Sequence, residues 1–256
     1  MTKAPTLATS SAALPPEGAQ SALGRPGGGF GRTRIKICGL TREQDVDAAV
    51  AAGADAVGFV LYDKSPRHVT PQRAAELARR LPPFVTPVLL FVNEDAADIA
   101  AACELLPGAT LQFHGDETPA RCLQASGTRS FLRAARIPLG KAAQAFDLVK
   151  YALDYSGARA ILLDAEVEGF GGGGKAFDWS LLPPSVNAHL VLSGGLSAAN
   201  VAEGILFLRP RCKSLAVDVS SGVESSKGIK DAEKIKQFVA AVRAADRHFE
   251  NLAGQG

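Results

Sequence analysis

The sequence predicts an α/β fold, a single-domain (β/α)8 TIM barrel with a disordered N-terminal tail. From Arg34 onward, short β-branched runs alternate with alanine-rich helical patterns, the alternation occurs eight times, and the connections are short. Strict βα alternation implies a parallel sheet, and eight such units fit a closed barrel. A doubly wound open sheet is the alternative, but it would need a nucleotide-binding fingerprint, and no GxGxxG follows the first strand.

Each expected strand is a short apolar run, rich in β-branched residues, that ends near turn or helix-start residues. We expect strands at residues 34–39, 56–62, 87–93, 110–114, 129–135, 159–164, 189–193 and 214–220.

The segments between the strands carry helical patterns with recognisable start signals. The expected N-caps are Thr41, Thr70, Asn93 and Asp178. Pro71 fits a first helical turn. The clearest patterns are TREQDVDAAVAAG, TPQRAAELARRLP, NEDAADIAAACELLP, AANVAEGILFLRP and KDAEKIKQFVAAVRAA.

The chain divides into three expected regions, a tail at 1–33, the barrel at 34–248 and a C-terminal tail at 249–256. The first tail is rich in Ala, Ser, Pro and Gly and has no hydrophobic periodicity, which is typical of disorder. It lacks the continuous apolar region of a secretory signal, and an organelle transit peptide is the alternative interpretation.

Charge and composition exclude several classes of function. The net charge of +2 arises within the tail, and the remainder holds 25 basic and 25 acidic residues without a basic stripe, which argues against nucleic-acid binding. No uninterrupted apolar window approaches about 18 residues, so no membrane span is expected. Four scattered cysteines without CxxC spacing indicate reduced thiols in the cytoplasm.

Side chains alternate along a strand, so the pattern predicts two faces for the sheet. Large apolar residues such as Ile35 and Ile37 form the face expected beneath the helices. The carboxyl ends of barrel strands converge on one mouth, where active sites lie. The other face brings polar or reactive residues there in five strands: Lys36 and Cys38, Gln112 and His114, Asp164, Ser193, and Asp218 and Ser220.

Cys38 and Asp164 are the candidate catalytic pair. Cys38 is either a buried core thiol or a reactive one, and Lys36, two residues away on the same face, would favour its thiolate. Asp164 is either a turn residue or an acid, and no helix pattern starts directly after it. An acid role at neutral pH requires burial to raise its pKa. A thiolate base and a carboxylic acid across one mouth suit proton relocation on a single substrate.

Three glycine-rich stretches indicate a phosphate site at this mouth. The stretch 169–175 follows the sixth strand, Gly194 and Gly195 end the seventh, and Ser220 and Ser221 end the eighth. Loops after strands seven and eight commonly hold phosphate in barrels, because glycine lets backbone N–H groups approach closely. Each stretch alone is equally consistent with a flexible or tight turn.

Three further polar residues are candidate substrate contacts. Arg67 lies in the loop after the second strand, where it is either solvated or a bidentate clamp for a substrate carboxylate. Gln112 and His114 are either ligand hydrogen-bonding groups or interior polar groups. No second residue with matching spacing accompanies His114, so we expect no metal.

Eight motifs in order together resemble the phosphoribosylanthranilate isomerase family of tryptophan biosynthesis. The resemblance runs from about Ile35 to the last helix, and each motif alone is weak. One departure is His68, where family members usually carry an aromatic residue. The motifs are KICG, the GADAVGF–KSPR stretch at 53–67, FVNE, QFHG, LLD, GGGGKAFDW, LVLSGGL and AVDVSSGVE.

The resemblance implies a barrel that performs an Amadori rearrangement of a small phosphorylated substrate without a cofactor. By motif, Asp164 would protonate the furanose ring oxygen and Cys38 would take the proton from C2. Arg67 would hold the anthranilate carboxylate, and Asp218 would contact the sugar hydroxyls. Phosphate would be held by Gly194, Gly195, Ser220 and Ser221. The chain is expected to be cytoplasmic, and either a monomer or a homodimer.

Two other functions remain as alternatives. One is the histidine-pathway isomerase that runs the same rearrangement on another aminoaldose; it resembles a two-aspartate design with repeated half-barrels, whereas Cys38 replaces one aspartate here and no repeat is visible. The other is a silent barrel that only binds a sugar phosphate, which the presence of both Cys38 and Asp164 argues against. Without the resemblance, the residues indicate an isomerase or lyase acting on a phosphorylated small molecule.

Overall fold

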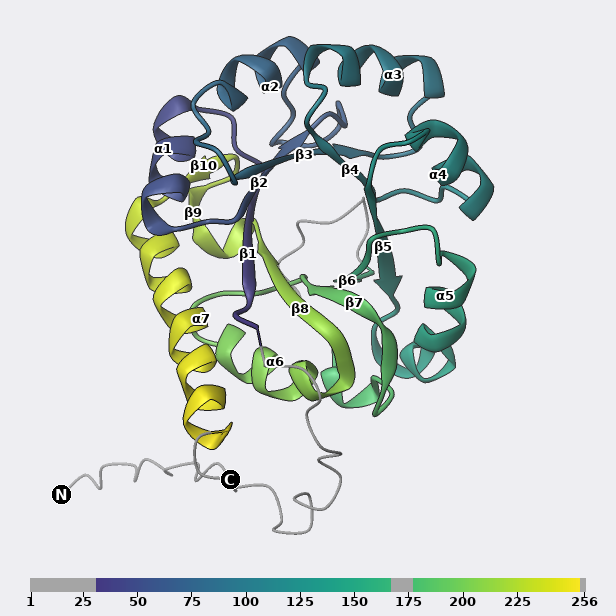
Figure 1. Cartoon of the computed structure of the whole chain (residues 1–256), viewed down its shortest axis with the longest axis vertical. Coiled ribbons are helices and arrows are strands. Elements are labelled where there is room, and N and C mark those ends of the chain that lie inside the picture. The colour runs from purple at the N-terminus through teal and green to yellow at the C-terminus, as the bar shows by residue number, and fades with distance from the viewer. Residues whose placement is uncertain (1–30, 167–176, 254–256) are drawn as a thin grey trace, which may run out of the picture. The chain divides into compact units, whose positions relative to one another are not determined.

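A computed structural model of the chain describes residues 31–166 and 177–253. Eight parallel strands follow one another around a closed barrel in sequence order, and β1 pairs with β8 to complete the ring. In Figure 1 the strands form the central ring and the helices lie outside it. The barrel predicted from the sequence is therefore confirmed.

The barrel strands coincide with the predicted segments to within a few residues. They are β1 (Arg34–Cys38), β2 (Ala56–Val60), β3 (Thr86–Phe91), β4 (Thr110–Phe113), β5 (Phe131–Ile137), β6 (Ala160–Ala165), β7 (Val186–Leu192) and β8 (Cys212–Val219).

Local capping explains where several helices begin. The hydroxyls of Thr70 and Thr118 each accept a hydrogen bond from the N–H three residues later, and proline follows each threonine at the first helical position. Asp178 likewise caps the short helix η3. The α-helices are α1 (Glu43–Ala52), α2 (Pro71–Ala78), α3 (Ala96–Leu105), α4 (Pro119–Ser126), α5 (Leu148–Asp154), α6 (Val201–Leu208) and α7 (Ala232–Ala253).

Buried apolar side chains separate into an outer layer and an interior, as strand alternation predicts. The outer layer lies between sheet and helices and includes Ile35, Ile37 and Phe113. The interior contains Cys38 in one apolar cluster and Leu162 in another. The two faces of each strand therefore keep the roles expected from the sequence, and the polar ends of the strands lie on the interior face.

Two of the four predicted N-caps are wrong. α1 begins two residues after Thr41, whose hydroxyl donates instead to the Gly228 carbonyl oxygen at 3.0 Å. In α3 the N-cap position falls on Asp95, without a side-chain cap bond, because Asn93 adopts a φ of 54° and its N–H donates to the Glu117 carboxylate at 2.7 Å. Both residues contact distant parts of the chain, and a local sequence pattern cannot reveal such contacts.

Two boundaries and one helix also differ from the expectation. Thr33, assigned to the tail by composition, is buried and donates to Asp246 through its N–H and its hydroxyl. At the other end α7 continues to Ala253, past the boundary expected at residue 248. Among the described residues between β6 and β7, the connection contains only η3 (Trp179–Leu181) in place of an eighth α-helix.

A small antiparallel hairpin between β8 and α7 was not predicted. It consists of β9 (Glu224–Ser226) and β10 (Ile229–Lys230), and it follows the short helix η5 (Ser221–Val223). Figure 1 shows the hairpin beside α1 and the end of β2, so it borders the barrel mouth. Over the described residues, no helix is both long and apolar enough to cross a membrane.

Candidate active site

The predicted polar side chains lie at the carboxyl ends of the strands, on the interior face. Those of Lys36, Gln112, His114, Asp164 and Asp218 are all buried. The hydrogen bonds among them connect neighbouring or near-neighbouring strands around the ring. The mouth therefore contains a set of buried polar groups that mostly pair with one another, and among the described residues Gln112 Oε1 has no hydrogen-bond partner.

Cys38 shares its corner of the mouth with an ion pair. Lys36 Nζ lies 2.9 Å from Asp218 Oδ1 on the neighbouring strand, and both side chains are about 95% buried. Gly58 on β2 makes room for this arrangement: a Cβ there would lie 2.7 Å from Cys38 Sγ and 3.1 Å from Lys36 Nζ. The thiol and the ammonium therefore occupy the same small volume above β2.

Electrostatics at this corner act on Cys38 in opposite directions. Burial raises the pKa of the Cys38 thiol, the Lys36 ammonium lowers it, and the Asp218 carboxylate raises it again, with a net increase. Burial also opposes the charge of Lys36, yet Asp218 and Cys38 together hold the pKa of Lys36 above its usual value. The net effect disfavours the Cys38 thiolate in the empty site, while Asp218 keeps Lys36 charged beside it.

Asp164 is held by a second chain of hydrogen bonds. Gln112 Nε2 lies 3.0 Å from His114 Nδ1, and His114 Nε2 lies 2.9 Å from Asp164 Oδ2. An amide nitrogen only donates, so His114 accepts at Nδ1 and donates to Asp164 at Nε2. Both ring nitrogens of His114 are thus engaged, and the bond to Oδ2 leaves Asp164 Oδ1 for other partners.

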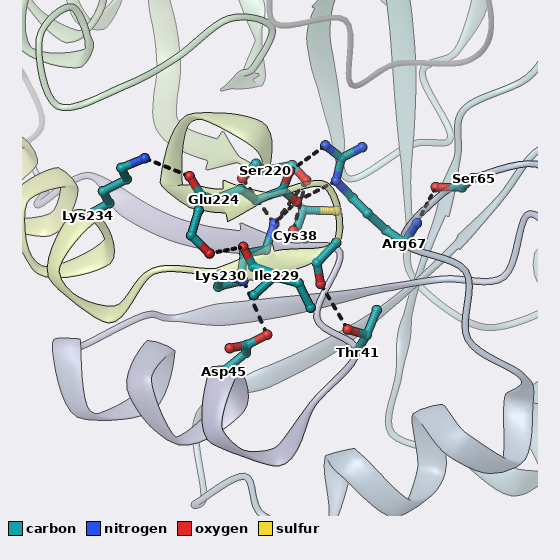
Figure 2. Close-up of polar contacts among 12 residues, drawn as sticks. Cys38, Thr41, Asp45, Ser65, Arg67, Ser220, Glu224, Ile229, Lys230 and Lys234 are labelled. Atoms are coloured by element: carbon teal, nitrogen blue, oxygen red, sulfur yellow. Dashed lines mark hydrogen bonds and ion pairs between the residues drawn. The ribbon is translucent and has the colours of Figure 1, made fainter.

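Arg67 is buried rather than an exposed loop residue. Its Nε donates to Glu224 Oε1 at 2.7 Å and its Nη2 to Glu224 Oε2 at 2.9 Å, as Figure 2 shows. This bidentate pair uses one edge of the planar guanidinium and leaves the edge formed by Nη1 and Nη2. No role for Glu224 was predicted from the sequence.

The loops after β7 and β8 approach each other at backbone distance. A Cβ at Gly222 would lie 1.9 Å from the Leu196 carbonyl oxygen, so only glycine permits this contact. Gly194 and Gly195 have φ values of 78° and 64°. Ser220 donates its hydroxyl proton to the Cys38 carbonyl at 3.0 Å, so a phosphate contact at Ser220 would come from its backbone.

Three residues at the mouth were missed in the sequence. Glu224 and Lys230 belong to the unpredicted hairpin, although Glu224 is part of the recognised AVDVSSGVE motif. Arg136 pairs in register with Asp164 and contacts Asp116 at 3.4 Å, but the strand was expected to end one residue before it. Continuing the inward alternation past Ala134 would have found it. The glycine stretch at 169–175 lies outside the described residues.

In the two described segments, no group of three or more His, Cys, Asp or Glu side chains could hold a metal ion. His114, the one residue considered for this role, is engaged with Gln112 and Asp164.

Comparison with known proteins places the chain among relatives of one kind. The family model described as N-(5'-phosphoribosyl)anthranilate (PRA) isomerase matches residues 35–241. A protein of that name from Methylibium petroleiphilum is 65% identical over 215 residues, covering 84% of this chain and 96% of the relative. One from Leptothrix cholodnii is 63% identical over 215 residues, covering 84% and 93%.

Solved structures agree with these relatives. The phosphoribosyl anthranilate isomerase of Thermotoga maritima is 39% identical, with a TM-score of 0.72 over 83% of this chain and 99% of that chain. Another isomerase structure, in complex with reduced 1-(o-carboxyphenylamino)-1-deoxyribulose 5-phosphate, is 35% identical, with a TM-score of 0.66 over 83% and 99%. The chain therefore belongs to the N-(5'-phosphoribosyl)anthranilate isomerase family.

Proposed function

We propose that this chain converts N-(5'-phosphoribosyl)anthranilate into 1-(2-carboxyphenylamino)-1-deoxyribulose 5-phosphate in tryptophan biosynthesis, with Asp164 as general acid and Cys38 as general base. One observation carries the assignment of roles. Cys38 and Asp164 end strands on the interior face of a closed barrel, separated along the ring by β7 and β8. A sugar between them would present its ring oxygen to one group and C2 to the other.

The first proton moves from Asp164 to the substrate. Protonation of the furanose oxygen breaks its bond to C1, and the nitrogen lone pair forms an iminium at C1. Because His114 donates to Oδ2, the other carboxyl oxygen, Oδ1, is the one that would deliver this proton. Asp164 leaves this step as a carboxylate.

The second proton moves from C2 to Cys38. The thiolate removes it, the electron pair neutralises the iminium, and the resulting enolamine tautomerises to the ketone. Burial raises the pKa of Cys38, which disfavours the thiolate in the empty site. The positive iminium beside it would favour the thiolate at the step that needs it, in the same way as the Lys36 ammonium does. Turnover therefore starts from the Cys38 thiolate and protonated Asp164, and passing the C2 proton from Cys38 to Asp164 restores both forms.

The remaining candidates bind the ends of the substrate. Arg67 would hold the anthranilate carboxylate through the guanidinium edge that Glu224 leaves uncovered. Asp218 would accept from sugar hydroxyls, and Gly194, Gly195, Ser220 and Ser221 would donate backbone N–H groups to the phosphate. The bonds of Gln112 and His114 support a role in holding Asp164 rather than in direct contact with the substrate.

The test compares two cysteine variants. Cys38→Ser is expected to bind reduced product with little change but to lose at least about 100-fold in kcat, since a serine hydroxyl is a far weaker acid than a thiol. Cys212→Ser, whose sulfur lies on β8 and donates to the Leu208 carbonyl, is the matched control and should retain full turnover. Near-normal turnover of Cys38→Ser would exclude this thiol as the base.

A further inference from the structure

We propose that Glu224 is a positioning residue that fixes the Arg67 guanidinium so that its uncovered edge faces the substrate carboxylate, with Lys230 keeping the cluster net positive. The inference rests on the proposed role of Arg67 and adds the residues through which that role is achieved. Glu224 and Lys230 pair with each other across the β9–β10 hairpin. Figure 2 shows both side chains beside Cys38 and Arg67.

The hairpin is attached to the walls of the mouth at several points. Thr41 Oγ1, in the loop after β1, donates to the Gly228 carbonyl at 3.0 Å. The Lys230 N–H donates to Asp45 of α1 at 3.3 Å, and Lys234 Nζ donates to the Glu224 carbonyl at 2.7 Å. These bonds give the Glu224 carboxylate a fixed place relative to β1 and α1.

Arg67 is restrained at both ends of its side chain. A Cβ at Gly39 would lie 2.4 Å from Arg67 Cδ, so the aliphatic stem lies flat against the backbone that follows Cys38. At the other end the two bonds to Glu224 fix the plane of the guanidinium, because a bidentate contact sets its orientation as well as its position. Without Glu224 the stem would stay in place while the guanidinium could rotate.

Lys230 adds a positive charge to the cluster, because the Glu224 carboxylate would otherwise neutralise the charge of Arg67. Its Nζ donates to Glu224 Oε1 at 2.9 Å, to the Ser220 carbonyl at 3.0 Å and to Ser220 Oγ at 3.2 Å, and its side chain is fully buried. Two cations and one carboxylate leave one positive charge toward an anionic substrate. The same lysine also connects the Arg67 clamp with the loop at the proposed phosphate site.

Burial and ion pairing act in opposite directions on the Glu224 carboxyl. Burial opposes the charge of Glu224, yet Arg67 and Lys230 hold the pKa of this carboxyl below its usual value. Glu224 therefore stays ionised at neutral pH. Burial lowers the pKa of the Lys230 ammonium, and the Glu224 carboxylate opposes this shift.

The decisive experiment measures binding of two ligands to the full chain by titration calorimetry. One ligand is reduced 1-(2-carboxyphenylamino)-1-deoxyribulose 5-phosphate, and the other is its phenylamino counterpart without the carboxylate. For Glu224→Gln we expect about tenfold weaker binding of the first ligand and less than about twofold change for the second. In steady state, KM should rise about tenfold while kcat stays within about twofold.

Matched variants separate the possible results. Glu233→Gln, an exposed carboxylate on α7, is the control and should change neither ligand. Glu224→Asp, which retains the charge but is one methylene shorter, should restore part of the lost affinity. In an Arg67→Ala background, Glu224→Gln should have no further effect on the carboxylated ligand.

Equal weakening of both ligands by Glu224→Gln would overturn the inference, since it would indicate a purely structural role for the hairpin. If Glu224→Gln does not fold, the same comparison with Glu224→Asp decides the question. The proposed clamp itself fails separately, if Arg67→Ala weakens the two ligands equally. In that case the function of the enzyme is untouched, but Arg67 does not recognise the carboxylate.

Discussion

Two reactive side chains at the mouth are each accompanied by a residue two positions earlier on the same strand. Lys36 accompanies Cys38 on β1, and Gln112 contacts His114 on β4. Residues i and i+2 project from the same face of a strand, so one short strand delivers both a reacting group and the neighbour that tunes or orients it. Such pairs need no loop and are held as rigidly as the sheet itself.

The first residue-scale prediction concerns the Lys36 ammonium. Its removal in Lys36→Gln takes away the interaction that lowers the pKa of Cys38 and leaves the Asp218 carboxylate, which raises it. The active form of the base is the thiolate, so the rising limb of kcat/KM should move to higher pH in the variant. Pre-steady-state rates across the alkaline range and ultraviolet thiolate absorbance measure this shift.

The control for this shift is Lys213→Gln, an exposed lysine near the amino end of β8. It should leave the pH profile of the enzyme in place. In the wild type, kcat/KM should rise at a pH above the ordinary thiol pKa of about 8.5, because burial is the largest effect on the pKa of Cys38. A Lys36→Gln limb that coincides with the wild-type limb contradicts the proposed coupling.

A second residue-scale prediction separates orientation of Asp164 from binding of substrate. His114 contacts Asp164 and Gln112 with its two nitrogens, so His114→Gln should lower kcat by about tenfold while affinity for the reduced product changes by less than about threefold. His189→Gln, at the other end of the barrel, is the control. A large loss of affinity with unchanged kcat would instead make His114 a direct substrate contact.

At the scale of elements, the loops after β7 and β8 form one unit through a single close contact. Gly222 approaches the Leu196 carbonyl so closely that an added methyl group would overlap it. The contact lies in the backbone, which cannot move aside as a flexible side chain could. The relative placement of Gly194 and Ser221 therefore depends on residue 222 having no side chain.

Gly222→Ala should for this reason weaken binding of phosphorylated ligands by about tenfold or more and lower the free energy of unfolding by about 1–3 kcal/mol. Isothermal titration with the reduced product and urea unfolding measure the two effects. Gly108→Ala is the matched control, since a Cβ at Gly108 meets nothing within 4 Å. Unchanged affinity in Gly222→Ala would show that these loops do not hold the phosphate.

The parts of the site that follow from local rules were predictable from the sequence. Strand alternation placed Cys38 and Asp164 on the inner face at the carboxyl ends of their strands, because side-chain direction is set by the backbone period alone. The Thr70 cap followed from the threonine and the proline after it. A barrel of eight βα units followed from the repeated alternation in the same way.

The parts that depend on distant contacts were not predictable. Arg67 and Glu224 are 157 residues apart, so no local pattern indicates that a loop arginine is buried against a hairpin carboxylate. Asn93 has the residue type of an N-cap, yet its N–H is taken by Glu117 and the helix starts later. In each case a tertiary contact outweighed the local preference.

At the scale of the whole molecule, a charged cluster around the buried Asp246 lies where the chain enters β1, at the end of the barrel opposite the mouth. Asp246 of α7 accepts from the Thr33 N–H at 3.1 Å and from its hydroxyl at 2.6 Å, and Arg209 and Arg243 also donate to it. One carboxylate thus joins the chain entering β1 to the end of α6 and to α7. The effect of this carboxylate on stability should be separable from catalysis, which we propose for the mouth.

Asp246→Asn is therefore expected to lower the free energy of unfolding at neutral pH by about 3–5 kcal/mol, since it leaves the buried Arg209 and the partly exposed Arg243 without their shared carboxylate. Burial opposes the charge of Asp246, but Thr33 and Arg209 hold its pKa below the usual value. A carboxyl with a depressed native pKa stabilises the fold above its unfolded pKa of about 3.9, and this stabilisation is lost as the pH falls through the native pKa.

The wild type should consequently lose stability steeply between about pH 4 and pH 2, and Asp246→Asn should lose less over the same interval. Urea unfolding at pH 7, 4 and 3 measures both slopes, with Asp98→Asn, an exposed carboxylate on α3, as the control. At a temperature where the variant is folded, its kcat and KM should match those of the wild type. An acid slope equal to that of the wild type would mean that Asp246 titrates alike in both states, and that the base of the barrel is held by its apolar contacts.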